Sequence, residues 1–256
     1  ESIMKKKADV VIVGTGVAGL FSALNLPDDK EIIMITKSDA ESSDSFLAQG
    51  GICVLRDEQD YDSYFEDTMR AGHYENRKES VDIMIRSSGK IIEDLVGYGV
   101  EFEKDGEAFA YTREGAHSRP RILFHADVTG KEITSKLLAR VREKNNVTIY
   151  EYTTMTDILE ENGKCAGITV KTQSGEESSI YADYTILASG GIGGLYQHST
   201  NFPHLTGDAL EVAKKHHIRL EHLDYVQIHP TTLYSEKPGR RFLISESVRG
   251  EGALLY

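Results

Sequence analysis

The sequence predicts an α/β fold in which a Rossmann-like nucleotide-binding domain carries an inserted β-meander. Three observations support this prediction. A strand, glycine-turn, helix and strand pattern occupies residues 8–36, residues 147–187 change toward a period of two, and a second glycine-ended strand follows. The chain has 256 residues, 39% of them hydrophobic, which is enough to bury a sizeable core. It shows no internal repeat, linker or low-complexity stretch.

The first element is a glycine-rich turn between two apolar strands. It joins residues 8–13 (ADVVIV) to a helix-like segment and then to residues 31–36 (EIIMIT), through Gly14, Gly16 and Gly19. In this GxGxxG pattern the first glycine permits a tight turn, the second lets the backbone approach a pyrophosphate, and the third lets helix and strand pack closely. A glycine-rich turn without a ligand is the alternative. The strand and helix around the motif favour nucleotide binding.

The acidic residue that usually binds a ribose, about 20 residues after the glycine motif, is missing. The second strand ends instead at Thr36 and Lys37. This departure weakens a simple NAD-binding interpretation.

Loops and helices are predicted between the glycine turn and the meander. Residues 38–60 form a predicted loop with an Ala-Gln-Gly-Gly turn at 48–51, and residues 80–96 place apolar side chains on one helical stripe. Thr129 and Glu132 form a predicted capping box at the start of the next helix.

A β-meander is predicted over residues 147–187, with turn signals at Asn162-Gly163 and Ser174-Gly175. Its last strand, 184–187, runs into a Ser-Gly-Gly sequence, and a helix follows near residues 208–216. A meander between two glycine-bearing strand ends fits a flavoprotein nucleotide domain better than a dehydrogenase domain, in which strands and helices alternate. A plain loop is the alternative for the second glycine cluster.

Charge and cysteine content exclude several functions. The formal net charge of −12 argues against general binding to nucleic acid or to an anionic membrane, since both require a basic surface. Cys53 and Cys165 lie far apart without metal-ligand spacing, so neither a disulfide framework nor a metal site is implied, and a reducing cytoplasm is expected. The basic, apolar N-terminal region resembles a signal peptide only superficially, because Asp9 and three glycines interrupt it.

Cations needed by an anionic ligand are concentrated in one segment. Thirteen residues contain Arg113, His117, Arg119, Arg121 and His125. Guanidinium groups pair bidentately with carboxylates and pyrophosphates, although a solvated surface loop is the alternative. A second basic stretch contains Arg240, Arg241 and Arg249. The polar residues 229–252 around it suggest the wall of a site.

Together these motifs resemble the flavoprotein subunit family of succinate dehydrogenase, fumarate reductase and L-aspartate oxidase. The resemblance covers nearly the whole chain and rests on VIVGTGVAGL, ITKS, SFLAQGGI, TREGAHSRPRILFHADVTG, ILASGGIGGLYQHSTN, TGDAL, QIHPTTLY and LISESVRGEGA. Within the family, the TREG motif at 112–115, with the HxR and HAD that follow, resembles the L-aspartate oxidase branch.

The resemblance implies a non-covalent FAD, because Asp44 stands where the respiratory members have a histidine joined covalently to the flavin. The residues that it implies for FAD contact are Gly14, Thr15, Gly16, Val17, Ala18, Gly19, Lys37, Asp44, Ser45, Phe46, Leu47, Ala48, Gln49, Gly50, Gly51 and Asp208. Lys37 then offers a reason for the missing acid.

The reaction implied is oxidation of L-aspartate to iminoaspartate, with oxygen or fumarate as electron acceptor, in cytoplasmic de novo NAD biosynthesis. Quinolinate synthase is an expected partner by analogy with the family. The resemblance places Glu114, His229, Ser245 and Glu246 around the dicarboxylate, with Glu114 and His229 as catalytic candidates and Glu114 attracting the substrate ammonium. A soluble fumarate reductase and a non-catalytic nucleotide-binding module are the alternatives.

Domain boundaries also follow from the resemblance. Residues 1–222 are expected to form an FAD-binding domain that lacks its C-terminal return segment, and residues 223–256 to begin an α+β capping domain. The family's catalytic arginine and further substrate residues fall beyond the position of Tyr256. The chain is therefore expected to be an inactive fragment that binds FAD weakly or not at all.

Overall fold

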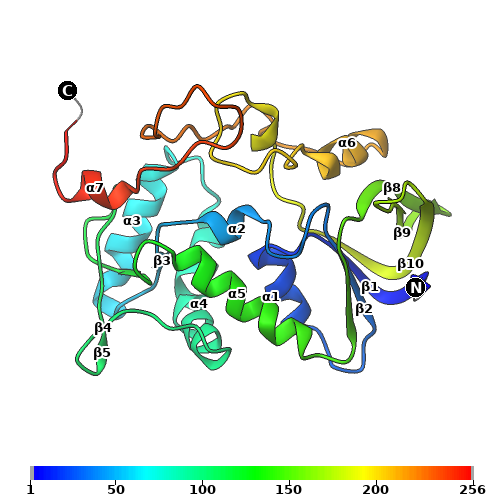
Figure 1. Cartoon of the computed structure of the whole chain (residues 1–256). Coiled ribbons are helices and arrows are strands. Elements are labelled where there is room, and N and C mark those ends of the chain that lie inside the picture. Colours follow the sequence, from blue (N-terminus) through cyan, green and yellow to red (C-terminus); the bar gives the residue numbers. More distant parts are fainter. Residues whose placement is uncertain (1–2, 255–256) are drawn as a thin grey trace. The chain divides into compact units, whose positions relative to one another are not determined.

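The computed structural model describes residues 3–254, which divide into two compact units (Figure 1). The first unit contains residues 3–46 and Leu137–Leu243, and the second contains Leu47–Lys136 and residues 244–254. These two compact units do not coincide with the two domains that the resemblance implies. The expected domain boundary at residue 222 stays a prediction.

A six-stranded mixed sheet forms the first unit, in the order β7-β2-β1-β10-β9-β8. Its strands are β1 (Lys7–Val13), β2 (Ile32–Ile35), β7 (Val147–Tyr150), β8 (Thr154–Glu161), β9 (Lys164–Lys171) and β10 (Glu177–Leu187). The first four strands in the sheet order are parallel, and β9 and β8 continue the sheet in antiparallel pairing. The predicted α/β fold class is confirmed.

The meander is shorter than predicted. Residues Val147–Tyr150 pair in parallel with β2 at one edge of the sheet, whereas β8 lies at the opposite edge. The connection leaves this edge at Tyr152, whose φ of 51° is left-handed. Its next residue, Thr153, donates to the carbonyl of Thr36 at 2.9 Å. The meander therefore consists of β8, β9 and β10, because no hairpin turn joins β7 to β8.

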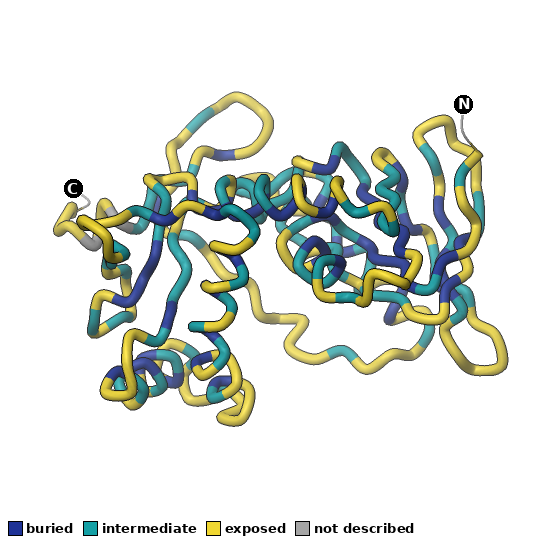
Figure 2. The backbone as a smooth tube through the Cα atoms, turned by 90° about the horizontal axis from the view of Figure 1, so that it is seen from below, coloured by how far each residue is buried: buried dark blue, intermediate teal, exposed yellow. Residues whose placement is uncertain are grey.

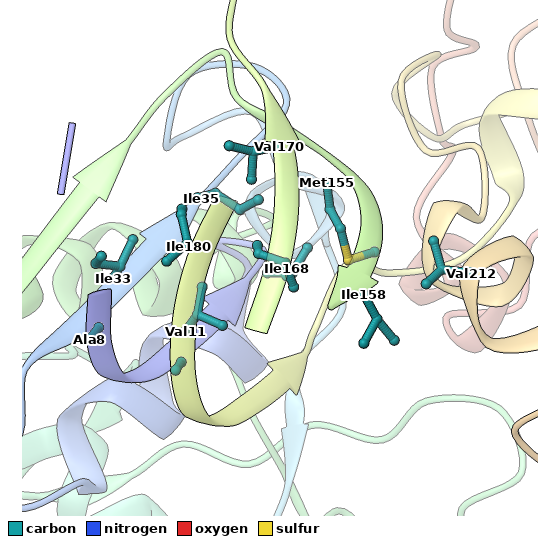
Figure 3. Close-up of a cluster of buried hydrophobic side chains, with 12 residues drawn as sticks. Ala8, Val11, Ile33, Ile35, Met155, Ile158, Ile168, Val170, Ile180 and Val212 are labelled. Carbon is teal, nitrogen blue, oxygen red and sulfur yellow. The ribbon is translucent and has the colours of Figure 1, made fainter. Parts of the chain in front are cut away.

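The core of the first unit lies between strands that are distant in sequence. Val11, Ile168 and Ile180, from β1, β9 and β10, are fully buried in one cluster. Figure 3 shows these side chains together with Val212, which lies beside Met155 and Ile158 of β8. Val212 belongs to α6 (Asp208–Lys215), so this helix is fixed to the sheet by apolar packing.

Shorter elements complete the first unit. Helix α1 (Val17–Asn25) packs beside β1, and the 3₁₀ helix η2 (Gly193–Leu195) follows β10. Helix α2 (Asp44–Leu47) was not foreseen within the predicted loop, because a single turn has no hydrophobic period.

Helix α5 (Thr129–Arg142) confirms the predicted helix, but its capping box is wrong. The Thr129 hydroxyl accepts the backbone N–H of His125 at 3.0 Å, and the Glu132 carboxylate accepts that of Glu101 at 3.2 Å. Both side chains thus bind the neighbouring loops rather than each other's backbone.

Two helices pack together in the second unit. Helix α3 (Tyr61–Ala71) and helix α4 (Lys78–Gly97) bury Tyr64, Met69, Val81 and Ile85 against each other. The remaining elements are η1 (Glu58–Asp60), the antiparallel pair β3 (Ile52–Cys53) and β6 (Ile122–Leu123), the pair β4 (Lys104–Asp105) and β5 (Ala108–Phe109), and α7 (Glu246–Gly250).

Helix α3 carries buried acids on its inner side. Asp67 is 3% exposed, and Asp60, which directly precedes the helix, is completely buried. Acidic residues at these positions interrupt the apolar period by which a helix is recognised in a sequence. Figure 2 colours the chain by residue burial and shows buried residues alternating with exposed ones along its length.

We expect truncation of Ile168 to destabilise the first unit. Ile168 is fully buried in β9, so Ile168→Ala should lower the free energy of unfolding by about 2–5 kcal/mol. Tyr184→Ala is the control, because Tyr184 of β10 is 72% exposed, and it should cost less than about 1 kcal/mol. Urea unfolding followed by circular dichroism measures both, and equal losses would contradict the core assignment.

Candidate functional site

A tight glycine turn joins β1 to α1. Gly14 follows β1 with a φ of 114°, and a Cβ placed on it would lie 2.2 Å from the carbonyl oxygen of Ala188. Its N–H donates to the carbonyl of Ile35 at 2.9 Å. Only glycine fits here, so the first glycine of the motif is required by close approach of three strand ends.

The N-terminus of α1 has features that suit an anion. Gly16 is its N-cap and therefore supplies no capping side chain, and its first turn contains no acid. The Val17 N–H donates to the Ser45 hydroxyl at 3.0 Å. The helix dipole and first-turn amides favour a phosphate at this end.

A cavity of about 240 Å³ opens at this helix end, within the first unit. Its lining combines the glycine turn, the ends of β1 and β2, the turn before α2, and the segment after β10. From the expected FAD residues it contains Gly14, Thr15, Gly16, Val17, Ala18, Lys37, Asp44, Ser45 and Asp208. Gly19 and the residues from Phe46 to Gly51 are not part of this lining.

An acid does lie at the end of β2, although the strand itself lacks one. The Asp208 carboxylate, at the start of α6, is 2.9 Å from the Lys37 ammonium. Thr206 bridges them, because its hydroxyl accepts from Lys37 at 2.9 Å and donates to Asp208 at 2.7 Å. An acid from a distant helix therefore lies at the end of β2, paired with Lys37.

Asp44 fixes the start of α2 to a distant loop. Its carboxylate accepts the Asn201 side-chain amide and the Phe202 backbone N–H, the latter at 3.0 Å. Burial raises the pKa of this carboxyl, while the Phe202 N–H and the positive charges of His204 and Arg240 act in the opposite direction. Asp44 thus has a structural function in this chain that the sequence did not indicate.

Glu114 lies in the second unit, where its half-buried carboxylate accepts the Gly51 N–H at 3.1 Å. The pKa of Glu114 is raised by burial, lowered by the Gly51 N–H, and raised again by the negative charge of Glu246. A Cβ on Gly50 would be 3.2 Å from the same carboxylate, so the contact is tight. The structure thus brings together Glu114, Glu246 and the Gly50-Gly51 backbone.

Ser245 and Glu246 lie at the start of α7, and both are half-buried. The carbonyl of Ser245 accepts the Val248 N–H at 3.2 Å, and Glu246 is 3.4 Å from Arg249. His229 belongs to the first unit, where its Nδ1 lies 3.1 Å from the carbonyl oxygen of Thr231. The remaining expected residue in the turn, Ala48, accepts the Gly130 N–H at 2.8 Å.

The cation segment at 113–125 does not all face a ligand. Arg121 is fully buried and pairs with Asp60 and Asp67, each at 2.7 Å. Arg119 also points to Asp60, at 3.4 Å. The prediction of an anion-binding cluster is therefore wrong for Arg121. The signal that could have revealed this is the pair of acids seven residues apart, which share one face of a helix.

Within residues 3–254, no three His, Cys, Asp or Glu side chains are grouped so that they could hold a metal ion. The helices in the same range lack an apolar stretch of the length that a membrane span requires.

Residues 9–256 match the protein family described as "FAD binding domain". L-aspartate oxidase of Clostridium perfringens is 47% identical over 253 residues, covering 98% of this chain and 57% of that protein. The enzyme of Clostridium acetobutylicum is 43% identical over 254 residues, covering 98% and 58%. The chain thus spans somewhat more than half the length of these relatives.

Solved structures are similar across the same range. E. coli quinol fumarate reductase superposes with a TM-score of 0.88 at 26% identity, covering 98% of this chain and 43% of that chain. A quinol-fumarate reductase with menaquinol molecules gives a TM-score of 0.89 at 27% identity, covering 98% and 44%.

Proposed function

The chain belongs to the FAD binding domain family, and from that premise we propose that it is part of an enzyme that oxidises L-aspartate to iminoaspartate with non-covalent FAD. The identity of 47% to an L-aspartate oxidase supports the proposal. The single observation that carries the choice of substrate is the half-buried Glu114 beside Glu246.

The cavity in the first unit suits the nucleotide portion of FAD. The α1 amides would hold the pyrophosphate, and Asp208 at the end of β2 would accept a ribose hydroxyl. Asp44 carries no nucleophilic imidazole, which supports a non-covalent cofactor. When bound, the flavin supplies the chemistry of hydride acceptance, and the protein supplies binding and orientation.

Glu114 suits an ammonium better than it suits a plain dicarboxylate. It is an acid partly removed from water, with a second acid close enough to raise its pKa. A cation placed beside Glu114 relieves this repulsion, whereas a ligand without an amine leaves the acid uncompensated. This favours an amino dicarboxylate over succinate or fumarate.

Fumarate reduction is the second candidate, since the solved structures that resemble the chain include quinol fumarate reductases. Comparing turnover of L-aspartate with that of succinate and fumarate separates the two reactions. The proposal also includes oxygen or fumarate as electron acceptor, a role in NAD biosynthesis, a cytoplasmic location and quinolinate synthase as a partner.

Closing the cavity should weaken FAD binding. Gly16 has φ −73° and ψ −177°, which valine adopts readily, but a Cβ there would lie 3.0 Å from the Ser45 hydroxyl. In the enzyme that carries this chain, Gly16→Val should raise the FAD Kd at least about tenfold by fluorescence titration. Gly89→Ala is the control, because nothing lies within 4 Å of its added Cβ. Unchanged affinity in Gly16→Val would refute the site.

Removing the charge of Glu114 should remove the preference for the amine. Glu114→Gln keeps the shape but loses a charge-assisted contact of about 1.5–3 kcal/mol, so kcat/KM for L-aspartate should fall about 10- to 100-fold. Inhibition by succinate should not weaken, because the charge that Glu114 leaves uncompensated beside a ligand without an amine is gone. Steady-state kinetics with both compounds measure this. Equal selectivity in both proteins would contradict the assigned role of Glu114.

Acid should weaken L-aspartate binding through the same residue. Because burial raises the pKa of Glu114, its carboxylate is protonated at a higher pH than an ordinary glutamate. Below that pKa the KM for L-aspartate should rise by about tenfold per pH unit, and it should be flat in Glu114→Gln. A KM profile that is the same in both proteins would show that another group titrates.

A further inference from the structure

Arg121 is a fully buried cation whose donors are all used. Its Nε and Nη2 donate to the two oxygens of Asp60 at 3.1 and 2.7 Å, and Nη2 also reaches the Ser63 hydroxyl at 3.1 Å. Its Nη1 donates to Asp67 at 2.7 Å and to His117 Nδ1 at 3.0 Å. A guanidinium has five N–H groups, so these five contacts leave no donor for a ligand.

Burying such a cluster costs solvation free energy, so its presence is not explained by a gain in the free energy of unfolding. Two buried carboxylates and one guanidinium must all be removed from water, and buried ion networks are often no more stabilising than apolar packing. Their best-supported use is to fix one geometry. The contacts of Asp60, Asp67 and Arg121 indicate which part of the backbone this cluster fixes.

Asp67 connects the cluster to the segment that carries Glu114. The carboxylate oxygen that accepts from Arg121 also accepts the Ser118 N–H at 2.8 Å and the Ser118 hydroxyl at 2.7 Å. Burial acts to raise the pKa of Asp67, but the hydrogen bonds from Ser118 and Arg121 outweigh it and hold that pKa far below its usual range, so Asp67 stays ionised. Three donors on one oxygen tie α3, Arg121 and Ser118 together.

His117 provides a second tie. Because arginine only donates, His117 Nδ1 must accept, which leaves the ring neutral with its proton on Nε2. Burial first, and then the Arg121 charge, lower the pKa of His117 and favour this form. Its Nε2 lies 3.4 Å from the thiol of Cys53, which belongs to β3, the strand that directly follows Gly51.

The segment held in this way is strained. Thr112 and Ile122 close its base with backbone hydrogen bonds of 2.9 and 3.1 Å, and Ala116 inside it has a φ of 70°. A left-handed alanine is disfavoured and persists only when surrounding contacts enforce it. Glu114 lies two residues before this point, so its placement depends on the same contacts.

We propose that Asp67 and Arg121 are positioning residues for Glu114. They hold residues 113–118 so that the Glu114 carboxylate rests on the Gly51 N–H, facing a substrate ammonium. The inference builds on the proposed function. It assigns selectivity for the amine to a buried ion cluster that does not touch the substrate.

Asp67→Asn and Asp60→Asn form a matched pair, since each removes the negative charge of one carboxylate that pairs with the buried Arg121 guanidinium. Asp60 acts on the segment only indirectly, through Arg121 and the partly exposed Arg119, whereas Asp67 accepts directly from the Ser118 N–H and hydroxyl. In the enzyme that carries this chain, Asp67→Asn should lower kcat/KM for L-aspartate about tenfold and leave the succinate inhibition constant within twofold. Asp60→Asn should leave both constants within about twofold.

Equal losses of kcat/KM for L-aspartate in the two variants would overturn the proposal in favour of a merely structural cluster. A loss of succinate binding together with the loss of kcat/KM would do the same. Glu114→Gln, measured in parallel, separates the two levels of inference. If Glu114→Gln keeps wild-type selectivity, the proposed function fails. If it loses selectivity and Asp67→Asn does not, only the positioning role fails.

Hydrogen exchange gives a readout independent of turnover. The Gly51 N–H is protected by Glu114, so its exchange should be about tenfold faster in Asp67→Asn and unchanged in Asp60→Asn. Ser118→Ala removes the hydrogen bond from the exposed Ser118 hydroxyl to Asp67 without changing any charge. It should make exchange of the Gly51 N–H about threefold faster. Wild-type exchange in both Asp67→Asn and Ser118→Ala would refute the proposal.

Discussion

Close backbone packing at Gly14 is the contact on which the nucleotide end of the first unit depends. Val13 pairs in parallel with both Ile35 and Leu187, so three strands end at the same level. The next residue must turn against the Ala188 carbonyl without a side chain. Because the turn is this tight, α1 begins directly above the strand ends and its first amides face the cavity. Lys37, which follows the end of β2, meets the Asp208 carboxylate at 2.9 Å beside the same cavity.

The second unit is organised by charge as much as by apolar packing. Its helices share a small core around Tyr64 and Ile85, and Arg121 stacks over the same tyrosine ring at 4.9 Å. The acids around Arg121 fix the path of the chain up to Ser118, and with it the position of Glu114. In this unit the proposed recognition residue is therefore held in place through a network that contains the Arg121–Asp60 and Arg121–Asp67 ion pairs.

Local patterns predict the first unit well, whereas in the second unit they predict helix α4 and miss helix α3. The glycine turn, the flanking strands and the antiparallel strands could be recognised because their periods and turn residues act over a few positions. The parallel pairing of Val147 with Ile32 could not, since nothing local distinguishes an edge strand from a hairpin strand. Helix α3 was missed because buried Asp67 interrupts its apolar stripe. Arg121 has the same sequence appearance whether it faces a ligand or an internal acid, and only long-range contacts decide between them.

The proposed function makes this chain part of a flavoenzyme that takes its electrons from an amino dicarboxylate. Anaerobic addition of L-aspartate to the flavin-loaded enzyme that carries this chain tests it most directly, with the flavin absorbance band followed over time. L-aspartate should bleach the band, and succinate at the same concentration should leave it unchanged. Bleaching by succinate but not by L-aspartate would contradict the proposed function.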